Sequence, residues 1–156
     1  MINSKSVSQS CLDASFHYLS YRPRSELEVK MRLRKRGFDD SSIESALLKL
    51  KEQGLVDDSA FAQLWKETRE SFSPRSRVML HRELRQKGVA SHIITEATKE
   101  IDEEAGAYRA GQKKAERLAS SDRDSFYRKL GSFLRRRGFN YEITQHTVKQ
   151  LWQERI

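Results

Sequence analysis

A short motif that occurs three times at an almost constant interval constrains the fold of this chain more than any other feature. Each copy has a leucine, three polar or basic residues, a glycine and then an apolar residue. The three glycines, Gly37, Gly88 and Gly138, are 51 and 50 residues apart. A repeat of this length is typical of arrays of helical units, in which each unit packs against its neighbour.

Apolar residues before each glycine predict that the motif ends an α-helix. Eight positions before the glycines stand Val29, Leu80 and Leu130, and leucines follow four positions later. The third copy adds Phe126 and Phe133. These residues share one face of a helix, whereas a strand would divide them between its two sides. The alternating apolar residues of the first copy alone would indicate a strand, but three copies outweigh them, so we predict helices capped by glycine.

Each motif is preceded by another helix and followed by a third. We expect the preceding helices at Leu12–Tyr21, Ser59–Glu70 and Glu104–Leu118. Ser25 with Glu28, and Ser41 with Glu44, predict capping boxes at two helix starts in the first copy. The sequence therefore predicts an all-α fold of about nine helices in three tandem three-helix repeats. Their expected bounds, after a flexible N-terminus at residues 1–10, are 11–57, 58–104 and 105–156.

The composition indicates thin local cores. Only 37% of residues are hydrophobic and 33% are charged, against about 45–50% and about 25% in typical globular domains. Each repeat can bury little surface alone, so neighbouring repeats must stack. We therefore expect an elongated, curved array that offers a long face to a partner and no small-molecule pocket.

Several classes of protein are excluded by what the sequence lacks. It has no phosphate-binding glycine loop, its four histidines are far apart, and Cys11 is its one cysteine. We therefore predict no catalytic residues, no metal site and no cofactor. Pairs of acidic residues such as Asp57-Asp58 stand at expected helix starts, where they favour the helix dipole. No apolar run is long enough to span a membrane and no secretory signal is present, so we expect a cytoplasmic monomer.

Basic residues are the main positive signal for function. The net charge is +8, and residues 103–156 carry twelve Lys and Arg against seven Asp and Glu. One or two cations in a last helical turn are explained by the helix dipole, but the third copy has more than that. Such a surface favours polyanions or acidic proteins. The predicted contact residues are Arg34, Lys35, Arg36, Arg85, Lys87, Arg128, Lys129, Arg135 and Arg136.

Four blocks in this order resemble the RecX family of regulatory proteins over almost the whole chain from Leu12. They are Arg24-Ser25-Glu26-Leu27-Glu28, Gly54-Leu55-Val56-Asp57-Asp58-Ser59-Ala60-Phe61-Ala62, Pro74-Arg75-Ser76-Arg77-Val78 with Glu83-Leu84-Arg85-Gln86-Lys87-Gly88-Val89, and Phe133-Leu134-Arg135-Arg136-Arg137-Gly138-Phe139. The chain departs from the usual pattern at Val29, Leu55 and Ser73, where leucine, tyrosine and glycine are frequent.

The resemblance implies three tandem three-helix repeats and a function as a modulator, usually an inhibitor, of the RecA recombinase. Members of this family lie in the helical groove of the RecA–DNA filament and limit its growth, ATPase and strand exchange. Two alternatives remain open on the residues alone. One is a stand-alone DNA-binding protein that uses a three-helix repeat like a helix-turn-helix. The other is a helical adaptor for a different acidic protein.

Overall fold

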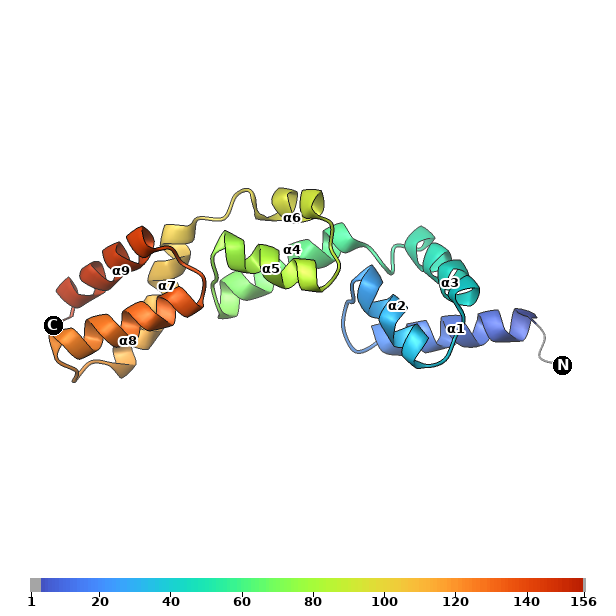
Figure 1. The fold of residues 1–156 in the computed structure, drawn as a ribbon, viewed down its shortest axis with the longest axis horizontal. Helices are drawn as coiled ribbons and strands as arrows, with labels where there is room; N and C mark the ends of the chain where they lie inside the picture. The colour runs from blue at the N-terminus through green and yellow to red at the C-terminus, as the bar shows by residue number, and fades with distance from the viewer. Residues whose placement is uncertain (1–3, 156) are drawn as a thin grey trace. The chain divides into compact units, whose positions relative to one another are not determined.

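The computed structural model describes residues 4–155, and within this range the chain forms nine α-helices and no strand (Figure 1). The all-α fold and the three tandem three-helix repeats predicted from the sequence are confirmed. The helices are α1 (Ser4–Leu19), α2 (Glu26–Lys35), α3 (Asp40–Glu52), α4 (Asp58–Phe72), α5 (Arg77–Gln86), α6 (Ser91–Thr98), α7 (Glu103–Arg117), α8 (Arg123–Arg136) and α9 (Tyr141–Gln153).

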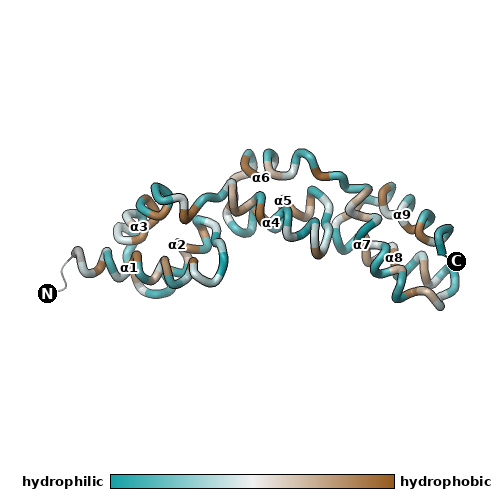
Figure 2. Tube along the Cα trace, turned by 180° about the vertical axis from the view of Figure 1, so that it is seen from behind, coloured by the Kyte–Doolittle hydropathy of each residue, from teal (hydrophilic) through white to brown (hydrophobic). Residues whose placement is uncertain are grey.

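The first repeat has its own small core, in which α1, α2 and α3 all contact one another. Val29 and Leu33 of α2 are fully buried, as their spacing before Gly37 predicts. They pack with Cys11 of α1 and with apolar residues of α3. Hydrophobic residues recur along the helices between hydrophilic ones in Figure 2, which is the pattern of helices that bury one face.

The third repeat has a larger and more aromatic core between α7, α8 and α9. Phe126, Leu130 and Leu134 of α8 are fully buried, so the inward face predicted for this helix is confirmed. Trp152 and Tyr127 pack against this core, with the Trp152 ring centroid 5.3 Å from that of Phe126. These rings therefore serve the core of the third repeat.

By its internal contacts the chain divides into two compact units, and the dividing points lie within the helices of the middle repeat. The first unit runs up to Leu64 and includes Leu84–Ile94, and the second contains Trp65–Glu83 and the chain from Thr95. Leu84 is fully buried in the first unit, and Leu80 is fully buried in the second. The repeat boundaries expected from the sequence stay a prediction.

All three motif glycines end their helices in the left-handed conformation, with φ of 90°, 81° and 93°. At the third, Gly138 N donates to Arg135 O at 2.9 Å and Phe139 N donates to Leu134 O at 3.2 Å. These two bonds form a Schellman cap, and the first two copies have the same pair. The predicted helix ends are therefore confirmed, and backbone N–H groups satisfy two of the last carbonyl groups of each helix.

Two local expectations at helix starts need correction, and one is confirmed. Helix α1 begins at Ser4, not Leu12, so residues 4–10 of the expected flexible terminus are helical; residues 1–3 lie outside the described range. Helix α3 is capped by Asp39, which accepts a bond from Ser42 N, and not by Ser41. An Asp side chain caps a helix as well as a Ser side chain does, and Asp39 is nearer than Ser41 to the glycine turn, so the helix begins after Asp39. The capping box of Ser25 and Glu28 is present.

Within the first unit, residues of the middle repeat dock onto the start of α2. The Ser25 hydroxyl, which caps α2, also donates to the carbonyl oxygen of Lys87 at 2.7 Å. Asp58, at the start of α4, accepts a bond from Glu26 N at 2.9 Å. A Cβ atom on Gly88 would lie 2.5 Å from Leu27 Cβ, so only glycine permits this close approach.

The second unit contains a matching joint at the start of α5. Ser76 N donates to Arg137 O at 3.1 Å, and Glu103, at the start of α7, accepts a bond from Arg77 N at 2.7 Å. A Cβ atom on Gly138 would lie 2.8 Å from Met79 Cβ and closer still to the Ser76 hydroxyl. The same type of contact thus joins successive repeats twice. In each case, the glycine turn and the acidic first residue of a helix in one repeat contact the first turn of the second helix in the preceding repeat.

Candidate functional site

Three of the five predicted cations of the first unit line a shallow groove between α2 and the end of α5. Arg34, Lys35 and Lys87 line this groove, and its apolar lining includes Leu27 and Met31, which is 55% exposed. Arg36 and Arg85 are exposed near the two helix ends. The structure therefore brings the two predicted clusters of this unit together, although they are about 50 residues apart in sequence.

Arg34 and Lys87 both contact carboxylates within this unit. The Arg34 Nε atom lies 3.3 Å from the exposed Asp40, whereas Lys87 faces a more buried carboxylate. The Lys87 Nζ atom lies 3.6 Å from Glu28, which also receives a 2.5 Å bond from Arg22. Burial alone would raise the pKa of Glu28, but the bonds from Arg22 and from Ser25 N, with the charges of Arg22 and Lys87, outweigh it and lower the pKa. Lys87 thus serves the joint between repeats as well as the groove.

The lowered pKa of Glu28 predicts that the protein loses stability in acid. A carboxyl group whose pKa is lower when folded stabilises the fold above its unfolded pKa, and this contribution is lost as pH falls through the folded pKa. We expect Glu28→Gln to be less stable than the wild type at neutral pH, with the difference shrinking below about pH 4. Urea unfolding of both proteins at neutral and acid pH measures it. A difference that does not change with pH would contradict this role for Glu28.

The predicted cations of the second unit lie along the exposed side of α8. Arg128 and Arg135 are seven residues apart, as are Lys129 and Arg136, so the four side chains follow one stripe over two helical turns. All four are exposed. Arg135 donates a long 3.4 Å bond to the Ser132 hydroxyl, and none of the four forms a salt bridge within the described residues. This stripe is therefore available to an acidic partner.

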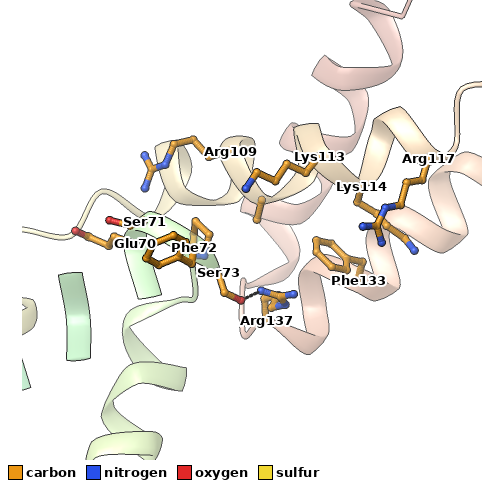
Figure 3. Close-up of a pocket in the computed structure, with 12 residues that line it drawn as sticks. Glu70, Ser71, Phe72, Ser73, Arg109, Lys113, Lys114, Arg117, Phe133 and Arg137 are labelled. Carbon is orange, nitrogen blue, oxygen red and sulfur yellow. Dashed lines mark hydrogen bonds between the residues drawn. The ribbon is translucent and has the colours of Figure 1, made fainter. Parts of the chain in front are cut away.

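A second cationic feature of this unit, which was not predicted from the sequence, is a pocket of about 220 Å³ beside the C-terminal end of α4 (Figure 3). Figure 3 shows basic side chains of α7 and Arg137 around the aromatic rings of Phe72 and Phe133. Glu70 is the one acidic residue among the described residues that line it. Its basic residues are Arg109, Lys113, Lys114, Arg117 and Arg137.

A cluster of arginines lies next to the pocket and adds to its positive potential. Glu83 accepts a bond from Arg75 at 3.1 Å and forms a 2.9 Å salt bridge with Arg69. Arg137 donates to the Ser73 hydroxyl. Burial, and then the charges of Arg75, Arg69 and Arg136, lower the pKa of Arg137. One carboxylate thus faces three guanidinium groups, so the cluster keeps a net positive charge, and its Arg137 lines the pocket.

The sequence did hold a signal for this pocket. Arg109, Lys113 and Arg117 are spaced by four residues, so they lie on one face of α7. The predicted contact residues are adjacent or nearly adjacent cations, whereas these three are spaced along a helix with other residues between them. The contribution of Phe72, Ser73 and Arg137 could not be predicted from spacing, because they come from other parts of the chain.

Two kinds of feature are not found among the described residues: a cluster of potential metal ligands and a membrane-spanning helix. No group of three or more His, Cys, Asp or Glu side chains in the described chain could hold a metal ion. No helix in the same part of the chain has the length and apolar character needed to cross a bilayer. The surfaces of interest are the two sets of exposed cations and the pocket.

Comparison with known proteins accounts for all three repeats. The RecX first, second and third three-helix domain families match residues 11–50, 57–97 and 102–148. The chain is 37% identical to the regulatory protein RecX of Chlorobaculum tepidum, over 90% of this chain and 87% of that protein. It is 34% identical to RecX of Amycolatopsis mediterranei, over 89% and 81%. The crystal structure of RecX from Lactobacillus salivarius superposes with a TM-score of 0.77 at 22% identity, covering 93% of this chain and 96% of that one. The chain therefore belongs to the RecX family of regulatory proteins.

Proposed function

We propose that this protein is a non-enzymatic, cytoplasmic regulator that binds the RecA–DNA filament as a monomer and inhibits its growth, ATPase and strand exchange. The observation that carries the proposal is the match of three RecX domain families, in order, to three repeats of this chain. The relatives named above carry the name regulatory protein, which supports a role exerted on a partner.

The distribution of charge supports a partner with an extended acidic surface. The groove of the first unit and the α8 stripe of the second lie on different repeats, and both present exposed arginines. Charges at the rim of an interface mainly steer association and fix the register of the partner. We assign this role to Arg34, Lys35, Arg36 and Arg85 in the first unit and to the four cations of α8 in the second.

A titration of RecA ATPase activity on single-stranded DNA tests the proposal. We expect this protein to reduce the ATPase rate, with a midpoint that shifts to higher concentration as salt increases, because salt screens exposed charges. A pull-down of RecA should succeed only with DNA and a nucleoside triphosphate present. An unchanged ATPase rate at excess protein would overturn the proposal. Sequence-specific binding to naked duplex DNA would instead favour a stand-alone DNA-binding protein.

A further inference from the structure

The residues that line the pocket between the end of α4, α7 and α8 carry an excess of positive charge. Five of these residues are basic and one is acidic. Arg109, Lys113 and Arg117 form no salt bridge within the described residues. Gathering like charges without a counter-charge is unfavourable in an isolated protein. The arrangement therefore points to an anionic ligand.

The length of the cationic row favours a chain of anions over a single one. Arg109, Lys113 and Arg117 follow each other at intervals of four residues along α7, which is about 6 Å per interval along the helix axis. This interval is comparable to the separation of successive phosphates in an extended nucleic-acid strand. Figure 3 shows Arg109 and Lys113 reaching from α7 toward the end of α4, and Arg117 lying farther along the helix.

An exposed aromatic ring stands beside this row. Phe72, the last residue of α4, is 78% exposed, although an apolar side chain of this size gains free energy from burial. Phe133 forms the other aromatic wall, and cations flank its ring, with Lys114 Nζ 5.9 Å and Arg137 Cζ 4.8 Å from its centroid. Phe72 is thus the ring with a free face, open for another planar group.

We propose that this pocket binds single-stranded nucleic acid, with phosphates along Arg109, Lys113 and Arg117 and an unstacked base on Phe72. Cations that follow a backbone beside an aromatic platform are the usual means of binding single strands without sequence preference. An acidic peptide would use the cations but would leave Phe72 exposed, and the bases of a duplex are stacked on one another. The inference does not depend on RecA binding.

Fluorescence anisotropy with labelled oligo(dT), in the absence of RecA, tests the proposal. We expect Lys113→Gln/Arg117→Gln to weaken binding and to reduce the dependence of log K on log salt by about 0.7 for each phosphate that the variant no longer neutralises. We expect Phe72→Ala to weaken binding at least about fivefold, with an unchanged salt dependence, because it removes a base stack and no charge.

Matched variants separate the pocket from the general charge of the protein. Arg82→Gln/Lys149→Gln removes two exposed cations outside the pocket, and Tyr141→Ala removes an aromatic ring that is 72% exposed on α9. We expect both to bind oligo(dT) like the wild type. Equal losses in the pocket and control variants would overturn the proposal. So would displacement of oligo(dT) by poly-glutamate together with no effect of Phe72→Ala, since this result identifies an acidic peptide as the occupant.

Discussion

Gly138→Ala is expected to lower the free energy of unfolding by about 2–5 kcal/mol. At φ 93° an alanine would be in the left-handed conformation, which destabilises the fold by about 1–2 kcal/mol. Its Cβ atom would also lie 2.8 Å from Met79 Cβ and against the Ser76 hydroxyl, so α8 would have to move away from the start of α5. Overpacking of this kind costs about 1–3 kcal/mol.

Gly37→Ala is the matched control, because Gly37 has φ 90° and an added Cβ atom meets nothing within 4 Å. We expect it to lose only the conformational part, about 1–2 kcal/mol. Urea unfolding followed by circular dichroism measures both variants. Equal losses would mean that the joint at Gly138 adds nothing to stability. A larger loss at Gly138 would assign the difference to the contact between the repeats.

Arg135→Glu/Arg136→Glu is expected to weaken binding to the RecA–DNA filament by about 100-fold, because reversed charges on the α8 stripe would repel an acidic partner. Both side chains are exposed and stand outside the core, so the fold should be retained. The readout is the concentration of protein that halves RecA strand exchange. Thermal unfolding of the variant checks that the third repeat is intact.

Arg82→Glu/Lys149→Glu provides the control for this variant, since it changes the net charge by the same amount at exposed positions away from the stripe. We expect only a small loss of inhibition, from weaker long-range attraction. Strand exchange blocked as strongly by the α8 variant as by the wild type would show that the contact residues lie elsewhere. Equal weakening by both variants would show that net charge, and not the stripe, sets the affinity.

Local spacing explains how much of the fold could be predicted. In each motif the leucine marks the buried face of the helix and the glycine forms the left-handed turn that ends it. The apolar residue after the glycine marks where the chain returns to the core. All three are local properties. The errors were local as well. Residues 4–10 have no apolar pattern that would indicate a helix, yet α1 extends through them. At the start of α3 two residues could cap, and Asp39 was preferred over Ser41.

The candidate site also has one part that the sequence predicts and another that it does not. Exposed cations on α2 and α8 could be identified from the sequence, because the helix period predicts which side chains point outward from a buried stripe. The groove that joins Arg34 to Lys87 could not be predicted from spacing. Nor could the pocket that places Phe72 beside Arg109 and Lys113. These contacts depend on how successive repeats dock, which no single helix specifies.

The sequence by itself determined that this chain is a series of helices, where most of them end, and which faces they bury, because helix period and glycine caps act over a few residues. Only the tertiary structure decided where successive repeats contact one another. Gly88 and Gly138 turned out to serve the joints between repeats as well as the helix ends, whereas Gly37 faces open space. The physical reason is that the apolar residues of a helix show which face is buried, but not which neighbouring element covers that face.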